Sequence, residues 1–85
     1  MAEEKLIGKV SHYFTKISVG IIELEDTVKV GDTIHIKGAT TDFTQQVESM
    51  QIEHESIKEA KAGQSIGLEV NEPVRENDKV YKVIG

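Results

Sequence analysis

The sequence predicts an all-β domain, a small barrel or sandwich of six short strands with at most one short helical turn. Two observations lead to this prediction. Runs rich in Ile and Val alternate apolar with polar residues, and Gly, Asp or Thr interrupts these runs about every 8–15 residues. With 85 residues the chain can bury one hydrophobic core, so residues 6–85 are expected to form a single domain after an N-terminal tail at residues 1–5.

The first two strands are expected at residues 6–14 and 17–24. In the second strand Ile17, Val19 and Ile21 share one face, because successive side chains of a strand point to opposite sides of the sheet. This alternation is typical of a strand and does not fit the period of a helix.

The third strand is expected at residues 33–37, directly after a Val-Gly-Asp turn. Alternation places Ile34 and Ile36 on the inward face and His35 and Lys37 on the outward face. This strand should therefore contribute two isoleucines to the core.

The second half of the chain is less regular. Residues 38–44 are expected to form a loop, because the Gly, Asp and threonines there show no sustained periodicity. A fourth strand follows at residues 45–53, with a break in register at Val47 that suits a bulge. Residues 56–62 combine a Ser-x-x-Glu capping box with two alanines, which predicts one or two helical turns, and residues 80–84 form the sixth strand. The inward face of the fifth strand consists of Ile66, Leu68 and Val70.

Charge and composition limit the classes of partner and the compartment. The net charge of −5 argues against a protein that coats nucleic acid through a basic face, so no DNA partner is expected. The chain has no cysteine, and no stretch approaches the ~20 apolar residues of a membrane span. These features predict a cytoplasmic protein without a membrane partner.

The residue pattern assigns no catalytic site and no cofactor. The Gly8-Lys9 pair is followed by Val10, which does not fit a phosphate-binding loop, so the chain alone should bind no nucleotide. Ser11 and His12 are adjacent on a strand and face opposite sides of the sheet. They therefore cannot act together as a nucleophile and its base.

Three histidines fall on or near three different strands, which a tridentate zinc site would require. They are His12, His35 and His54. Their spacing matches no metal motif, and local spacing places no carboxylate beside His35 to orient its ring. No metal is therefore expected.

The segment from Lys9 to Lys16 combines aromatic and basic residues. Two interpretations of it stay open. A nucleic-acid base could stack on Tyr13 or Phe14 while the lysines contact phosphate. Alternatively, Phe14 closes one end of the core and Tyr13 caps an exposed edge.

Four segments resemble, in order and spacing, the second domain of elongation factor Tu and its relatives. They are residues 19–21 (VGI), 28–34 (VKVGDTI), 47–50 (VESM) and 61–67 (KAGQSIG). The resemblance covers residues 6–83 and implies a closed six-stranded Greek-key β-barrel of the translation-protein type, here as a stand-alone domain. It also implies that Gln64, Ser65 and Ile66 line a shallow pocket for the end of a tRNA, with Val30 near its floor. Where elongation factor Tu has Glu-Asn, this chain has Gln-Ser.

A second family is similar as well, the carboxy-terminal barrel of collagenase-like peptidases. The matching segments are residues 8–10 (GKV), 30–32 (VGD) and 43–50 (FTQQVESM). In that family the barrel is an accessory to a catalytic domain. This resemblance implies an alternative function, a protein-interaction subunit that acts in trans with a peptidase-like or RNA-modifying enzyme.

The main prediction is a non-enzymatic, translation-factor-like barrel that binds RNA or the ribosome, and the alternative is a protein partner. The expected RNA- or partner-binding residues are Lys9, Tyr13, Lys16, Gln64, Ser65 and Ile66. Catalytic residues, cofactors and metal ligands are not assigned.

Overall fold

The secondary structure consists of β-strands. The structure is a computed structural model that describes residues 3–53 and 55–84, and within them it contains ten strands and no helix. The prediction of an all-β fold is therefore confirmed. The strands are β1 (Glu4–Phe14), β2 (Val19–Leu24), β3 (Val28–Lys29), β4 (Thr33–Lys37), β5 (Asp42–Gln46), β6 (Met50–Ile52), β7 (Glu55–Ile57), β8 (Glu59–Ala60), β9 (Ser65–Glu69) and β10 (Lys79–Val83). Among the described residues no helix is long and apolar enough to cross a membrane.

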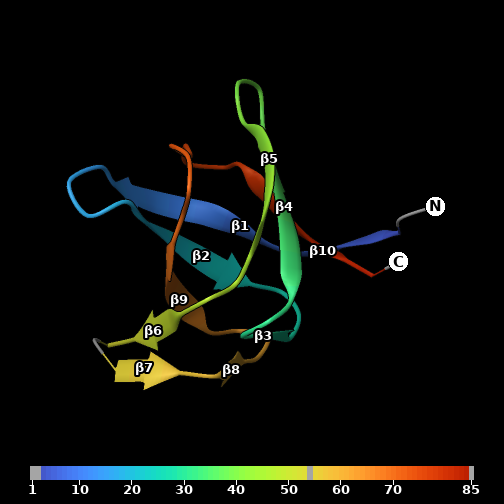
Figure 1. Cartoon of the computed structure of the whole chain (residues 1–85), viewed down its shortest axis with the longest axis vertical. Coiled ribbons are helices and arrows are strands. Elements are labelled where there is room, and N and C mark those ends of the chain that lie inside the picture. Colours follow the sequence, from blue (N-terminus) through green and yellow to red (C-terminus); the bar gives the residue numbers. More distant parts are fainter. Residues whose placement is uncertain (1–2, 54, 85) are drawn as a thin grey trace.

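Eight of the strands form one antiparallel sheet, which curls around the core in the order β5-β4-β10-β1-β2-β9-β6-β7 (Figure 1). The short strands β3 and β8 pair separately. Strands β5 and β7 are the two ends of the large sheet, so the backbone ladder of the described strands does not close into a ring. The predicted closed six-stranded Greek-key barrel is thus not confirmed.

Several element boundaries differ from the prediction; β2, for example, begins at Val19 and not at residue 17. β1 begins at Glu4, which pairs with Val83 of β10, so the strand takes in part of the expected N-terminal tail. The predicted loop at residues 38–44 is shorter as well, because β5 already begins at Asp42. Asp42 pairs with Lys37, and β4 and β5 therefore form a hairpin with a short connection.

The helical turn expected at residues 56–62 is wrong, because this segment contains strands β7 and β8. Ala60 of β8 is 0% exposed and pairs with Val28 of β3. A capping box stabilises at most a short turn that has little stability of its own. Strand pairing here also buries apolar side chains, so tertiary contacts override the local helix signal.

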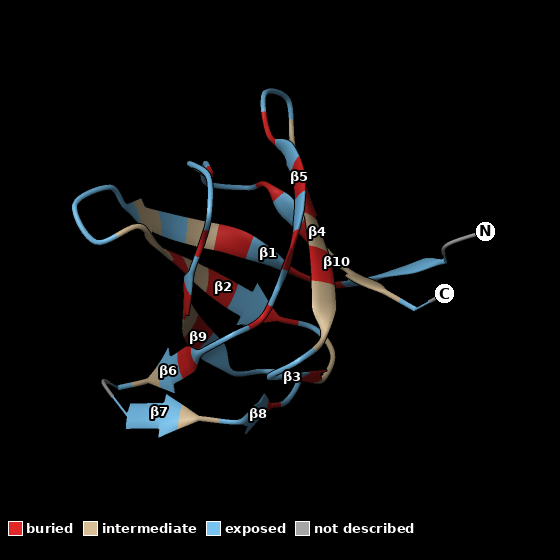
Figure 2. Ribbon diagram, in the orientation of Figure 1, coloured by how far each residue is buried: buried red, intermediate tan, exposed pale blue. Residues whose placement is uncertain are grey.

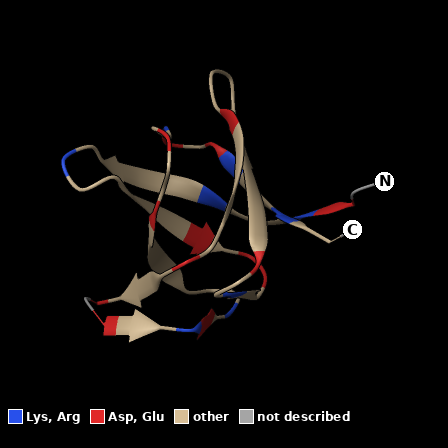
Figure 3. Cartoon of the chain, in the orientation of Figure 1, with Lys and Arg blue, Asp and Glu red and all other residues tan. Residues whose placement is uncertain are grey.

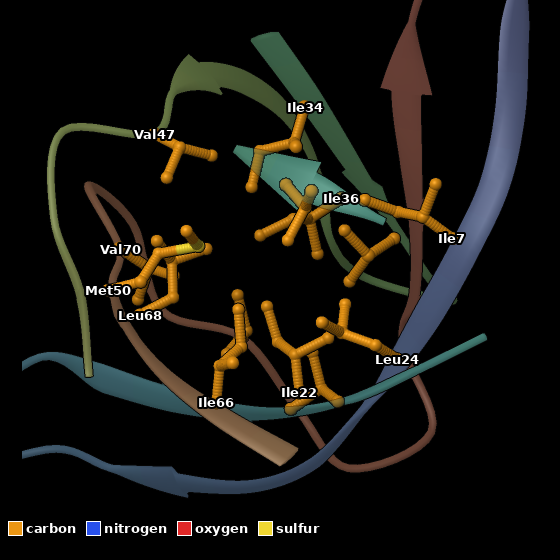
Figure 4. Close-up of a cluster of buried hydrophobic side chains, with 14 of the residues drawn as sticks. Ile7, Ile22, Leu24, Ile34, Ile36, Val47, Met50, Ile66, Leu68 and Val70 are labelled. Atoms are coloured by element: carbon orange, nitrogen blue, oxygen red, sulfur yellow. The ribbon is translucent and has the colours of Figure 1, made fainter. Parts of the chain in front are cut away.

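The buried side chains form one hydrophobic core, and the stretches of chain that carry them are red in Figure 2. Ile34 and Ile36 are 1% and 0% exposed, whereas Lys37 is exposed, as the alternation predicts. The expected inward residues of the fifth strand are also buried. They are Ile66, Leu68 and Val70. Figure 4 shows these side chains and those of β4 pointing into the same cluster from different strands.

The outer face of β2 is apolar. Every second residue between 20 and 24 is buried, so Val19 and Ile21 lie on the opposite, outer face and are half-buried. Ile17 precedes the strand and is 62% exposed. The three apolar residues therefore share one side, as predicted, and that side faces away from the core.

A buried side chain connects β5 to the end of β9. The Gln45 Nε2 donates to the Glu69 carbonyl oxygen (2.9 Å), and the Gln45 Oε1 accepts from the Asn71 N–H (2.7 Å). After β5 the chain turns away at Val47, where two backbone hydrogen bonds hold it to the turn before β4. The expected break at Val47 is confirmed, and it divides the predicted fourth strand between β5 and β6.

Candidate functional site

A cleft beside β1 and β2 brings together three of the six predicted binding residues. We call it the Lys9 cleft. Its volume is about 390 Å³, and it is lined by Lys9, Glu23, Leu24, Glu25, Gly63, Gln64 and Ser65. One lysine and two glutamates give its wall both signs of charge, so the cleft suits a polar group.

Strand pairing places three of these side chains in a row. Lys9 of β1 pairs with Glu23 of β2, and Glu23 pairs with Ser65 of β9. Directly paired residues have Cβ atoms about 4.5–5.5 Å apart on the same face of a sheet. All three residues are exposed, so the row lies on the outer surface.

A tight turn builds the remaining wall of the Lys9 cleft. The Leu24 N–H donates to the Gln64 carbonyl oxygen (2.9 Å), and the Gly63 N–H donates to the Leu24 carbonyl oxygen (2.9 Å). Gly63 has a φ of 89°, a left-handed conformation that glycine adopts without steric cost. The Gln64 Oε1 accepts from the Lys61 N–H (2.7 Å). The carbonyl end of the Gln64 side chain is therefore part of the scaffold.

The other expected residues lie elsewhere. Ile66 is 1% exposed and belongs to the core, so its side chain lines no part of this cleft. Val30, expected near the floor of the same pocket, is not among the lining residues. Tyr13 and Lys16 lie on the hairpin between β1 and β2, whose tip is basic in Figure 3.

The β1–β2 hairpin carries an apolar surface. Two grooves of about 370 Å³ each meet at Phe14 and Ile17. The first is lined by residues 13–17, and the second extends over the outer face of β2 and the neighbouring strands. Phe14 is 45% exposed and Ile17 is 62% exposed. We call the surface formed by Tyr13, Phe14, Lys16, Ile17, Val19 and Ile21 the hairpin surface.

The structure tests the second interpretation of the aromatic residues. Tyr13 is half-buried and packs against the core, whereas Phe14 is exposed. The expectation that Phe14 closes the core is therefore wrong. The turn of the hairpin is held by the Val70 N–H, which donates to the carbonyl oxygen of Ser18 (2.9 Å). Ser18 itself adopts a left-handed conformation, with a φ of 55°.

A third concave region lies between the β4–β5 hairpin and the segment before β10. We call it the β5 cleft. Its volume is about 590 Å³, and it is lined by residues 40–43 and 72–75 together with Tyr13 and Thr15. Tyr13 and Thr15 also belong to the groove at the hairpin tip. The β5 cleft and the hairpin surface are therefore continuous.

Sequence reasoning missed a charged cluster around His35. Its Nδ1 lies 2.8 Å from a carboxylate oxygen of Glu4, and its Nε2 lies 2.5 Å from one of Asp42. The hydrogen bond to Asp42 is the main cause that raises the pKa of His35; partial burial opposes it, and Glu4 adds to the rise. Glu4 is 31 residues away in the chain, so local spacing carried no signal for this contact.

His12 does not join this cluster. The ring of His12 packs edge-on against Phe14 with the ring centroids 4.7 Å apart, and His54 lies outside the described residues. Within residues 3–53 and 55–84, no group of three or more His, Cys, Asp or Glu side chains is arranged to hold a metal ion.

Comparison with known proteins identifies protease-type relatives. No known protein-family profile matches the chain. The chain is 46% identical over 76 residues to an uncharacterized protease of Methanocaldococcus jannaschii, a match that covers 88% of this chain and 19% of that protein. It is 35% identical over 82 residues to a collagenase of Porphyromonas gingivalis, which covers 94% of this chain and 23% of the collagenase. The chain spans about a fifth of the length of these relatives.

A solved structure shares the fold. It is the C-terminal domain of a protein described as a U32 peptidase from Geobacillus thermoleovorans. The TM-score is 0.86 with 20% sequence identity, and the superposition covers 92% of this chain and 91% of that domain. At this identity the likeness shows the fold alone.

These findings correct the main functional prediction. The expected kinship with the second domain of elongation factor Tu is not supported, and the prediction of a translation-factor-like, RNA-binding barrel is wrong, because the relatives are a protease and a collagenase. The prediction of a non-enzymatic protein is contradicted for the same reason. The second resemblance, to collagenase-like peptidases, is supported. The chain is thus related to one segment of protease- and collagenase-type proteins and has the fold of the C-terminal domain of a U32 peptidase.

Proposed function

We propose that the chain is a peptidase-associated domain that binds the catalytic part of a protease-type protein. The observation that carries this proposal is the extent of the matches. Nearly the whole chain aligns with a segment that makes up about a fifth of each relative, and about four fifths of each relative lies outside the match. The part of each relative that lies outside the match is therefore the partner that we propose for this domain.

The hairpin surface supplies the contact in this proposal. Phe14 and Ile17 are large apolar residues that the domain leaves exposed, and Val19 and Ile21 extend the apolar area along β2. Exposed apolar patches of this kind mark interaction sites, and aromatic anchors contribute much of the energy of protein interfaces. Tyr13 and Lys16 are the polar members of the hairpin surface, whereas the Lys9 cleft, with Gln64 and Ser65, offers a separate polar site.

The proposal is tested by replacement in a relative with a named activity. The segment of the Porphyromonas gingivalis collagenase that matches this chain would be exchanged for the chain, and collagen cleavage compared with the unchanged enzyme and with a deletion of the segment. We expect the chimera to cleave collagen faster than the deletion, because the inserted domain restores the contact. A chimera no more active than the deletion would contradict the proposal.

Two substitutions locate the contact within the chimera. Ile17→Asp places a charge on the hairpin surface at a residue that is 62% exposed, so it should lower cleavage without unfolding the domain. Lys61→Ala, at an exposed position outside the hairpin surface, is the matched control and should leave cleavage unchanged. Equal activity of the two variants would exclude the hairpin surface as the contact.

A further inference from the structure

The β5 cleft adjoins the hairpin surface and differs from it in its backbone chemistry. Its volume of about 590 Å³ lies within the range of sites that bind small ligands or peptide segments. It opens where the β4–β5 hairpin stands away from the segment that leads into β10 (Figure 1).

Two backbone segments line this cleft, the start of β5 and residues 72–75. β5 is an end strand of the large sheet and pairs with β4 on one side. Across the described part of the chain, no backbone–backbone hydrogen bond joins β5 to residues 71–74. The link at Gln45 is made by a side chain, and it lies at the end of β5 that is away from the hairpin connection. From Gln45 toward residue 42 the outer edge of β5 therefore has no strand partner.

The lining side chains suit an extended polypeptide. Tyr13, Phe43 and Val74 contribute apolar surface, and the last two are 8% and 3% exposed. Glu72 and Arg75 are exposed and charged at the rim. An apolar floor with polar groups at its margin is the arrangement that holds alternate side chains of a bound strand.

The charges of the cleft favour a basic segment. Asp42 and Glu72 contribute carboxylates and Arg75 contributes one positive charge, and the Asp42 carboxylate lies 2.5 Å from the His35 Nε2, which offsets its charge when the ring is protonated. This balance disfavours a phosphate backbone, which needs a basic surface. A lysine or arginine of a bound peptide can pair with Glu72, which enters no ion pair within residues 3–53 and 55–84.

We infer that the β5 cleft binds an extended, basic polypeptide segment, which adds to the outer edge of β5 as a further strand. Unpaired strand edges are templates for this kind of addition. The inference rests on the proposed function and deepens it, because it gives a protease-associated domain a polypeptide ligand. Five residues of β5 span about 16 Å, so the bound segment is about five to eight residues long.

Titration of the 15N-labelled chain with a synthetic peptide tests this inference. The probe is a peptide of about eight residues in which valine alternates with lysine. The matched control has the same side chains with N-methyl groups on alternate backbone amides, which removes the donors that pair with β5. We expect shifts of the amide signals of residues 42–45 and 72–75 with the first peptide. The control should bind about tenfold more weakly or worse, because it loses two or three hydrogen bonds.

Charge variants test whether the β5 cleft attracts a positively charged peptide. Glu72→Lys should weaken binding of the lysine peptide about two- to fivefold, and Arg75→Glu should strengthen it by a similar factor. Lys58→Glu makes the same charge change as Arg75→Glu but at an exposed residue that does not line the β5 cleft, so it should leave the affinity unchanged.

Each remaining outcome overturns the inference. No shift at millimolar peptide, equal binding of the N-methyl control, or shifts confined to the hairpin surface or the Lys9 cleft would contradict strand addition to β5. These results are independent of the chimera. A chimera that cleaves collagen while the chain binds no peptide preserves the proposed function and removes the inference. Peptide binding by the chain together with an inactive chimera preserves the inference and removes the proposed function.

Discussion

The side chain of Gln45 should make an unusually large contribution to stability for a polar residue. It is 8% exposed and bonds at both ends of its amide, to the Glu69 carbonyl oxygen and to the Asn71 N–H. It is thereby the described side chain that ties β5, one end of the large sheet, to the end of β9. We predict that Gln45→Met, which keeps the length and approximate volume of the side chain, destabilises the protein by about 2–4 kcal/mol.

The magnitude follows from the two groups that lose their partner. A buried donor or acceptor left unsatisfied costs about 1–3 kcal/mol, and here one donor and one acceptor are affected. Both bonds are partly buried, so water recovers some of the loss and the lower half of the summed range applies. A domain of this size has a stability near the low end of ~5–15 kcal/mol, so the change removes a large fraction of it.

Urea unfolding measures the effect. With a slope of about 1–1.5 kcal/mol/M for a small protein, a loss of 2 kcal/mol moves the unfolding midpoint by roughly 1–2 M. The control is Gln46→Met, at the next residue of β5, which is exposed and should change stability by no more than about 0.5 kcal/mol.

Hydrogen exchange makes the test specific to the bond. The Asn71 amide donates to Gln45, so it should exchange slowly in the unchanged protein and faster in Gln45→Met than the loss of global stability explains. Equal unfolding midpoints for the two glutamine variants, or an Asn71 amide that exchanges freely in the unchanged protein, would refute the reasoning.

Two further predictions concern the core and the charged cluster. Leu68→Ala should lower the free energy of unfolding by about 2–5 kcal/mol, because Leu68 is 1% exposed and its truncation leaves a cavity. Lys37→Ala on the outer face should lower it by no more than about 0.5 kcal/mol. Similar urea midpoints for the two variants would contradict the assigned faces. The pKa of His35 is raised from 6.5, chiefly by the hydrogen bond to Asp42, so the charged ring stabilises the fold. That contribution is fully present below the unfolded pKa and is lost as the pH rises through the folded pKa. Unfolding free energies measured from about pH 5.5 to 8.5 should therefore fall more steeply for the unchanged protein than for His35→Gln, and parallel curves would count against the cluster.

Alternation along single strands was readable from the sequence. The period of two placed Ile34 and Ile36 inward and Lys37 outward, and it identified Leu68 as a core residue. These positions depend on the local geometry of one strand, which a few consecutive residues specify. The positive φ of Gly63 was predictable for the same reason, because a turn is a local structure.

Contacts between segments decided the features that the sequence did not reveal. The segment with a capping box became β7 and β8, because pairing with β3 buries Ala60. The shared apolar face of Ile17 and Val19 was predictable, but its outward direction depends on which side of β2 meets the core.

The candidate sites divide in the same way. Lys9, Gln64 and Ser65 were predicted as binding residues, and pairing of β1, β2 and β9 brings them into one cleft. The β5 cleft and the contact between His35 and Glu4 had no motif, because their parts are far apart in the chain and are brought together by the tertiary structure. The sequence by itself thus determined the all-β class of the fold and most of the core of this protein. Which surfaces lie side by side was decided by tertiary structure, since it depends on pairing between residues that no local pattern connects.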